Sequence, residues 1–129
     1  MIAMNSINLN LDLEDDFKFA QFSEFAIRKI GGIRHILLSD LNTGMLLGLK
    51  SRYNDKNIDH SKISAIMTHF FQLNENEFQN KNELKISINE LATFKIFSTK
   101  YNDKVISLIT DNETNIGLIR MLIQRMFKK

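Results

Sequence analysis

The three histidines of this chain are side chains that could bind a metal ion or move protons. A zinc site in a protein needs several His, Cys or carboxylate ligands around one ion. His60 and His69 are nine residues apart in a predicted helix, which puts them on opposite sides of it, and His35 lies in a predicted strand. The sequence contains no cysteine, which excludes thiolate ligands and thiolate nucleophiles. We therefore interpret the histidines as core or surface residues and predict no metal site.

Acidic pairs and a glycine pair are the other residues whose spacing could support chemistry. Asp15, Asp16, Asp111 and Glu113 fall where helices are predicted to begin, and the helix dipole stabilises carboxylates there. The pair Gly31-Gly32 lacks the further Gly, Lys and Ser or Thr of a phosphate-binding loop, so it is typical of a helix end. The sequence therefore predicts a protein that is not an enzyme on its own and that binds no cofactor.

Composition and charge limit the classes of function. The chain has 17 Lys and Arg against 15 Asp and Glu, and a net charge of +2 is too small to form a nucleic-acid groove. No apolar run approaches the roughly 20 residues of a membrane span, and the start lacks the basic and apolar blocks of a signal peptide. The absence of cysteine favours a reducing compartment. We expect a cytoplasmic protein, and its length of 129 residues predicts one domain.

Residues 31–50 are predicted to form the β-hairpin that positions the rest of the chain. Residues 36–38, Ile-Leu-Leu, form an unbroken apolar run that is typical of a strand covered on both faces. Asp40 to Gly44 supply the turn, since Gly44 adopts a positive φ without a Cβ clash. Residues 45–49 then return, and the other elements must cover or extend this hairpin.

Three further strands are predicted in the second half of the chain. Residues 84–89 alternate strictly between apolar and polar, as expected of a strand at the edge of a sheet. Residues 93–99 follow after a tight link, and residues 105–109 are nearly all apolar, which favours a more central position. Because the links between neighbouring strands are short, the five-stranded sheet should be antiparallel.

Three helices complete an α+β order of helix, two strands, helix, three strands, helix. The first covers residues 15–30, the second covers residues 59–78, and the third starts at Asp111 or Asn112. Each has a broad apolar face. We therefore expect helices over both faces of the sheet.

The helix over residues 59–78 has one apolar face and one mild, nearly uncharged face. The apolar arc, predicted to pack on the sheet, comprises Ile63, Ile66, Met67, Phe70, Phe71, Leu73 and Phe78. The opposite face comprises Ser61, Ala65, Thr68, Gln72 and Glu75. Such side chains let another surface approach closely without burying a charge. Two interpretations stay open, a face for a partner and a plain solvated face.

Residues 1–14 precede the predicted domain, which covers residues 15–129. Ile7, Leu9, Leu11 and Leu13 alternate with polar residues, which is the period of a half-buried strand. This segment is either an added edge strand, in its own sheet or in a neighbour's, or an N-terminal arm that orders weakly.

Two segments together match the pattern of a known family. They are residues 32–40, Gly-Ile-Arg-His-Ile-Leu-Leu-Ser-Asp, followed by residues 43–47, and residues 111–120, Asp-Asn-Glu-Thr-Asn-Ile-Gly-Leu-Ile-Arg. In this order they resemble the Roadblock family, the dynein light chain and small-GTPase regulator domain, over about residues 16 to 128. The alternating arm and the Phe-rich second helix depart from the family pattern. The resemblance implies a profilin-like sandwich of strand order 2-1-5-4-3, with the second helix on one face and the other two on the opposite face.

The resemblance also implies a homodimer, in which the third strands pair edge to edge and the second helices lie side by side. The sequence agrees, because residues 84–89 are predicted to form an edge strand. This strand contains only one charged residue that would oppose pairing with another strand. The predicted dimer-interface residues are Ile63, Met67, Phe71, Lys85, Ser87 and Ile88. We expect this interface to bury at least roughly 1,600 Å² in total.

The function that the resemblance implies is that of a non-catalytic, homodimeric regulator or scaffold for a small Ras-like GTPase, including the role of a GTPase-activating partner. Such a partner accelerates GTP hydrolysis by holding the switch loops or by inserting an arginine. The platform for the GTPase would comprise Ser61, Ala65, Thr68 and Gln72 from both subunits. Arg52, in the loop ahead of it, is interpreted as a solvated charge or as an arginine that acts in trans.

Two alternatives compete with the regulator. The first is a structural adaptor, as in the dynein-associated relatives, which joins larger protein complexes and changes no nucleotide turnover. The second is a small-ligand sensor, which the sequence disfavours because it shows no evident polar pocket.

Overall fold

The structure, a computed structural model, describes residues 16–77 and 85–126. Within these residues it contains three helices and five strands, in the predicted order. They are α1 (Asp16–Lys29), β1 (Ile33–Asp40), β2 (Leu46–Ser51), α2 (His60–Glu77), β3 (Ile86–Glu90), β4 (Phe94–Tyr101), β5 (Lys104–Asp111) and α3 (Ile116–Met126). The predictions for the arm over residues 1–14, and for Phe78 and Leu84, lie outside the described residues.

The strands form one antiparallel sheet of order β2-β1-β5-β4-β3, as the resemblance implied. The apolar run in β1 lies between β2 and β5, where the strand is covered on both faces. The alternating strand β3 lies at one edge of the sheet, and β2 lies at the other. The predicted central and edge positions are therefore confirmed.

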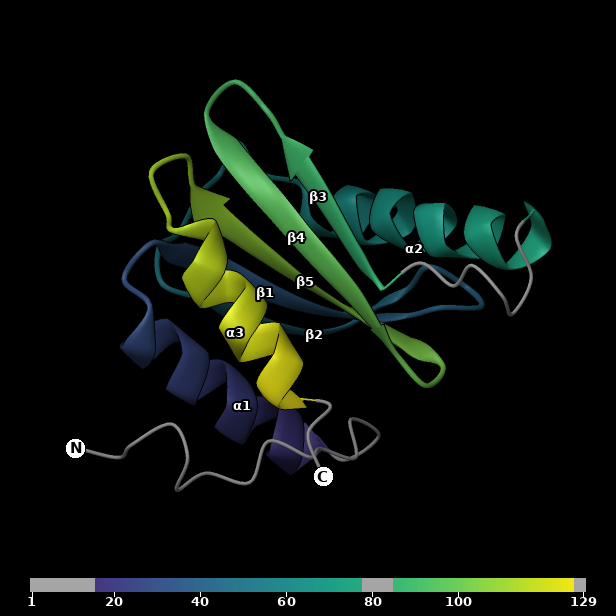
Figure 1. The fold of residues 1–129 in the computed structure, drawn as a ribbon, viewed down its shortest axis with the longest axis horizontal. Helices are drawn as coiled ribbons and strands as arrows, with labels where there is room; N and C mark the ends of the chain where they lie inside the picture. The colour runs from purple at the N-terminus through teal and green to yellow at the C-terminus, as the bar shows by residue number, and fades with distance from the viewer. Residues whose placement is uncertain (1–15, 78–84, 127–129) are drawn as a thin grey trace.

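The two faces of the sheet carry different helices (Figure 1). Helices α1 and α3 lie side by side over one face, where Phe22 of α1 and Leu122 of α3 share a buried cluster with Ile36. Helix α2 covers the opposite face, where Met67 packs on Leu37. Successive residues of a strand point to opposite faces, so the adjacent residues Ile36 and Leu37 can serve the two layers.

The turn between β1 and β2 is built as predicted. Asp40 Oδ1 accepts hydrogen bonds from the backbone nitrogens of Asn42 and Thr43, at 2.8 and 3.1 Å. Gly44 has a φ of 77°, which a residue with a Cβ rarely adopts. The turn chemistry of residues 40–44 thus fixes the start of β2.

The orientation of α2 on the sheet differs from the helical-wheel prediction. Ile66, Phe70 and Leu73, predicted to be buried, have exposed fractions of 44%, 37% and 44%. Thr68, predicted to face outward, is 1% exposed, and Ser64 is fully buried. The helix is therefore rotated by about a quarter turn from the position that maximises apolar contact.

Buried hydroxyl groups explain this rotation. On the sheet face under α2, Ser98 Oγ and Ser107 Oγ lie 2.8 Å apart, and Ser39 Oγ lies 2.6 Å from Ser64 Oγ of the helix. Because the sheet presents Ser39 beneath the helix, a helix face that contains Ser64 makes a hydrogen bond that an all-apolar face would leave unmade.

Helix α3 begins later than predicted. Asn115 Oδ1 accepts a hydrogen bond from the backbone nitrogen of Gly117 at 2.7 Å, so Asn115 caps the helix. The predicted starting residues, Asp111 and Asn112, instead end β5 and begin the loop that follows it. All of these residue types cap helices well, so local sequence alone did not separate them.

Candidate interaction surface on helix α2

The β1–β2 turn is hydrogen-bonded to one flank of α2. Gln72 Nε2 donates a hydrogen bond to the carbonyl oxygen of Leu41 at 2.6 Å. Ser64 Oγ lies 2.9 Å from the carbonyl oxygen of Gly44. Helix and turn therefore form one continuous surface, although about 20 to 30 residues separate them in sequence.

The backbone of Gly44 lies close to the helix. A Cβ added to Gly44 would lie 3.2 Å from Thr68 Oγ1 and 3.4 Å from Ala65 Cα. Only a residue without a side chain combines this proximity with the positive φ.

An open hollow of about 340 Å³ lies where the turn meets the helix. It is lined by Thr43, Gly44, Ala65, Ile66, Thr68, His69, Phe70 and Gln72. Apart from one histidine, these side chains carry no ionisable group, which suits contact with another protein better than recognition of a charged small molecule.

Three of the four predicted platform residues border this surface from accessible positions. Ser61 and Ala65 are exposed, and Gln72 is half-buried. The hydroxyl of Thr68 donates within its own helix instead, lying 2.9 Å from the carbonyl oxygen of Ser64. The prediction that Thr68 faces outward is therefore wrong, because its hydroxyl and methyl group lie in the layer between helix and sheet.

The predicted dimer-interface residues fall into two groups. Met67 and Phe71 are buried beneath α2 in their own chain. Ile63 and Ser87 are half-buried, and Lys85 and Ile88 are exposed at the β3 edge. The sequence prediction placed Ile66, Phe70 and Leu73 in the core. The structure exposes these three side chains and buries Ser64, Met67, Thr68 and Phe71 instead, so the exposed apolar side chains of α2 were not identified from the sequence.

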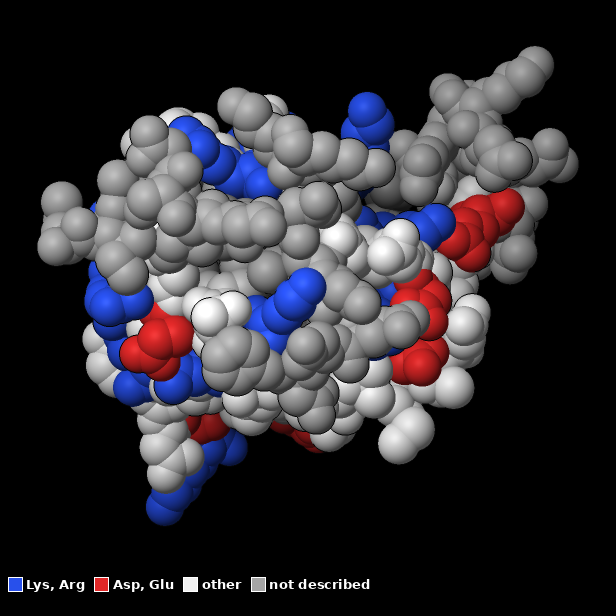
Figure 2. Space-filling model, turned by 90° about the horizontal axis from the view of Figure 1, so that it is seen from below, with Lys and Arg blue, Asp and Glu red and all other residues white. Residues whose placement is uncertain are grey.

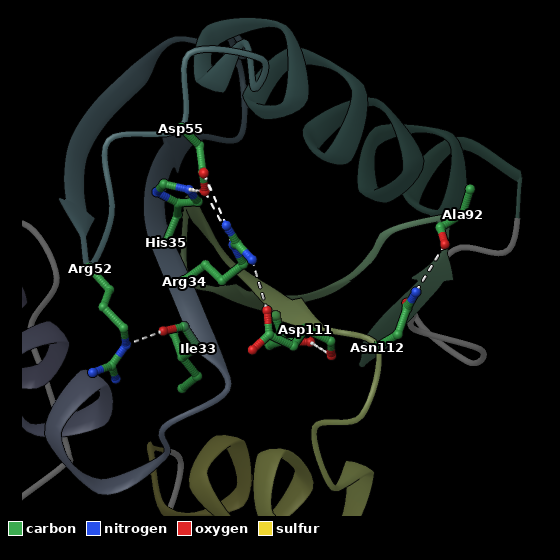
Figure 3. A network of polar contacts seen from close by, with 9 residues as sticks. Ile33, Arg34, His35, Arg52, Asp55, Ala92, Asp111 and Asn112 are labelled. Carbon is green, nitrogen blue, oxygen red and sulfur yellow. Dashed lines mark hydrogen bonds and ion pairs between the residues drawn. The ribbon is translucent and has the colours of Figure 1, made fainter.

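A polar network fixes the loop that leads into α2 (Figure 3). Arg34 Nε and Nη2 donate to the two carboxylate oxygens of Asp55, at 3.1 and 3.0 Å. Arg34 Nη1 donates to Asp111 Oδ1 at 3.0 Å. One arginine on β1 therefore holds both the loop and the end of β5.

His35 extends this network beneath the start of α2. Its side chain is fully buried, with Nε2 2.7 Å from Asp55 Oδ2 and Nδ1 2.8 Å from Ser51 Oγ. The order serine, histidine, aspartate is that of a hydrolase triad. Here, however, both oxygens of Asp55 also bind Arg34, so the arrangement acts as a structural tie between β1, β2 and the loop.

The network changes the protonation of two side chains. Hydrogen bonds from Arg34, and then from His35, lower the pKa of Asp55 below its usual value. Burial lowers the pKa of His60, whose ring stacks edge-on against His35 at a centroid distance of 4.7 Å, and the charge of His35 lowers it further. The network therefore favours an ionised Asp55 and a neutral His60.

Arg52 has a role that neither sequence interpretation anticipated. Its Nε donates to the carbonyl oxygen of Ile33 at 2.8 Å (Figure 3), and its Nη2 donates to those of Ile27 and Ile30 at the C-terminal end of α1. The interpretation of Arg52 as a solvated loop charge is wrong, because its guanidinium binds carbonyl oxygens of its own chain at the end of α1 and the start of β1.

Three features of residues 16–77 and 85–126 concern metal ligands, surface charge and helix hydropathy. Residues 16–77 and 85–126 contain no group of three or more His, Cys, Asp or Glu side chains that could hold a metal ion. On the face drawn in Figure 2, the described Lys and Arg side chains are interspersed with Asp and Glu. None of the helices in these ranges is long and apolar enough to cross a membrane.

The sequence matches no protein-family model and no curated protein. Among solved structures, the gliding protein MglB from Thermus thermophilus matches with a TM-score of 0.70 at 14% identity, over 83% of this chain and 81% of that one. Myxococcus xanthus MglB matches with a TM-score of 0.67 at 21% identity, over 84% and 89%. A Roadblock/LC7 domain from Streptomyces avermitilis matches with a TM-score of 0.62 at 11% identity, over 78% and 88%. The chain therefore has the Roadblock fold, as the resemblance of its two sequence segments implied.

Proposed function

We propose that this chain is a non-catalytic regulator or scaffold of a small Ras-like GTPase and that it acts as a homodimer. The shared fold supports the GTPase part, since the family resemblance implies a small-GTPase regulator domain. The observation that carries the proposal is the strip of exposed apolar side chains on α2, Ile66, Phe70 and Leu73, on the same side of the sheet as the platform. Such a strip is typical of a protein interface.

Helix α2 has two flanks with different neighbours. On the first, Met67 lies beside β3, where Asn89 Nδ2 is 3.6 Å from Met67 Sδ. Phe70 follows Met67 by three residues and Ile66 by four, so these side chains form one continuous ridge, which we call the β3 flank. Its outer residues, Ile66 and Phe70, also line the far side of the hollow. On the second flank, Gln72 faces the β1–β2 turn.

A second copy of the chain is the occupant that we propose for the β3 flank. Strand β3 ends the sheet, and an edge strand presents backbone groups that an identical strand can pair with. Pairing of two β3 strands about a twofold axis brings the two α2 helices together, so that Ile66 and Phe70 cover their counterparts. Of the predicted interface residues, Ile63, Lys85, Ser87 and Ile88 offer accessible surface, and Met67 and Phe71 support it from beneath.

The second flank is the proposed platform for the GTPase. Ala65 and Gln72 line the hollow beside the turn, Ser61 is exposed one helical turn before Ala65, and none of the three carries a charge. A GTPase switch loop can approach such side chains closely, because the contact does not require the unfavourable desolvation of a charged group. In a dimer, the two platforms lie on the same side of the joined sheet.

The arginines of this region favour positioning of switch loops over insertion of an arginine. The guanidinium of Arg52 binds carbonyls of its own chain, and that of Arg34 binds Asp55 and Asp111. Either side chain would have to break these contacts to reach a nucleotide. A platform that holds the switch loops needs no such rearrangement.

The test measures binding and GTP hydrolysis by a Ras-like GTPase from the same organism, with and without this protein. Ala65→Glu places a carboxylate in the hollow, and we expect it to weaken binding by at least about tenfold. The matched control is Met121→Glu on α3, which adds the same charge at an exposed apolar position on the opposite face. Wild-type affinity in Ala65→Glu would contradict the platform assignment.

The structural adaptor is the second candidate. The engagement of Arg34 and Arg52 within the chain disfavours an activator that inserts an arginine, and it is equally compatible with an adaptor and with a regulator that positions switch loops. The same assay separates the two functions. Binding that leaves the hydrolysis rate unchanged supports the adaptor, whereas faster hydrolysis supports the regulator.

A further inference from the structure

The second edge of the sheet, strand β2, also leaves apolar side chains uncovered. Leu47 and Leu49 have exposed fractions of 45% and 43%. Leu49 pairs with the buried Leu37 of β1, which packs under α2, so Leu49 lies on the α2 face. Leu47 precedes it by two residues, at the bulge where the register between β1 and β2 shifts. Within the described ranges, no strand lies beyond β2.

We infer that residues 7–13 of the same chain pair with β2 as a sixth, antiparallel strand and cover Leu47 and Leu49. Ile7, Leu9, Leu11 and Leu13 alternate with Asn8, Asn10 and Asp12. This period suits a strand with one face against apolar side chains and the other in water.

The position of α1 supports this occupant. Phe19 of α1 packs on Gly48, where an added Cβ would lie 2.9 Å from the Phe19 ring. Further along, Glu24 Oε2 lies 2.8 Å from Lys50 Nζ. Helix α1 therefore runs above β2 in the same direction and starts near the beginning of β2.

The length of chain ahead of α1 fits the edge. Leu13 is three residues before Asp16, so it lies within roughly 10 Å of the start of α1. A strand that ends there and lies beside β2 must run antiparallel to it. Seven extended residues span about 23 Å, enough to match all six residues of β2.

The short connection also favours the same chain over a second copy. A segment tethered by a few residues has an effective concentration in the millimolar range, which exceeds typical concentrations of a separate partner. The apolar residues of the segment then lie across from those of β2, with Leu11 opposite Leu49 and Leu13 near the bulge at Leu47.

This pairing would give the two edges of the sheet different roles. A sheet with two free edges can add copies at both ends and grow into an open chain. With β2 covered by residues 7–13, only β3 remains available for a second copy, and association stops at a closed dimer. The inference does not depend on the proposed GTPase, and it concerns the edge opposite the proposed dimer contact.

The absence of native cysteine allows a direct cross-linking test in the full chain. Directly opposite residues of an antiparallel pair have Cα atoms about 4.5 to 5.5 Å apart, a separation that a disulfide can span. We expect Leu11→Cys with Leu49→Cys to form a disulfide within one chain, with monomer mass in non-reducing gels. Leu11→Cys with Ile88→Cys, at the opposite edge, is the matched control and should stay reduced. A cross-link of dimer mass in the first variant would overturn the inference in favour of an exchanged segment.

Hydrogen exchange provides a second measurement that does not depend on the exact register. We expect Leu11→Asp to speed exchange of the backbone amides of residues 46–51 by at least about tenfold, because their outward groups lose their partners. The control Asn10→Asp changes the water-facing side of the same segment and should leave exchange near the wild-type rate. Unchanged exchange of residues 46–51 in Leu11→Asp would overturn the inference.

Discussion

Asp55 accepts hydrogen bonds from Arg34 at both carboxylate oxygens, with N···O distances of 3.1 and 3.0 Å. The contact joins the first residues of β1 to the loop that precedes α2. Because α2 carries the proposed platform, this ion pair helps to set the position of the interaction surface as well as the stability of the fold.

Asp55→Asn is therefore expected to destabilise the protein. The substitution removes the charge that Arg34 and His35 contact, and hydrogen bonds to charged groups are worth about 1.5 to 3 kcal/mol. We expect a loss of about 1 kcal/mol in the free energy of unfolding, measured by urea denaturation, since Asp55 is partly solvated. Asp103→Asn, in an exposed pair with its neighbour Lys104, is the control and should change stability little. Equal stability of the two variants would show that the Asp55 network is not a structural tie.

Stability is expected to fall on mild acidification because of His60. Burial lowers the pKa of His60 in the folded protein below the value of about 6.5 that the unfolded chain has. As pH falls through 6.5, the unfolded state binds a proton that the folded state binds less well, so the free energy of unfolding decreases. Thermal melts between about pH 7.5 and 5.5 should show this decrease, and His60→Gln should reduce it. An equally steep decrease in His60→Gln would assign the effect to other groups.

Asp55 is expected to lower the free energy of unfolding further at more acidic pH. Its folded pKa is depressed by Arg34 and His35, so its contribution is complete above the unfolded value of about 3.9 and is lost as pH falls through the folded value. Asp55→Asn should therefore show a shallower loss of stability below about pH 4 than the wild type.

Phe70→Glu is expected to convert the proposed homodimer into a monomer. It places a carboxylate in the β3 flank, where the side chain would face its own counterpart across the twofold axis. Light scattering coupled to size-exclusion chromatography at micromolar concentration measures the mass. Met121→Glu, exposed on the other face of the sheet, should leave the wild-type mass unchanged. A monomeric wild type would contradict the dimer itself.

Gly44→Ala is expected to destabilise the β1–β2 turn. The position has a φ of 77° and contacts Thr68 and Ala65, so a Cβ introduces both backbone strain and crowding. The left-handed conformation alone costs about 1 to 2 kcal/mol for a residue with a side chain. Gly31→Ala is the matched control, because a Cβ there meets no atom within 4 Å. Denaturant titrations should therefore separate the two variants by at least about 1 kcal/mol.

The elements that the sequence predicted well are those defined by local chemistry. The apolar run in β1 and the residues Asp40 and Gly44 specify the first hairpin through burial and turn geometry. These features act over a few residues. The alternation that identified β3 as an edge strand is equally local, because burial on one face imposes a period of two along the chain itself.

The sequence by itself thus determined the order of helices and strands, the first hairpin and the edge position of β3. Only the tertiary structure decided which side of α2 meets the sheet, because the burial of Ser64 depends on Ser39 and Gly44, hydroxyl and carbonyl partners some 20 to 25 residues earlier. It also decided the role of Arg52, whose acceptors lie in α1 and β1. Hydrogen bonds between distant residues leave no periodic trace in a sequence, whereas turn chemistry and burial patterns do.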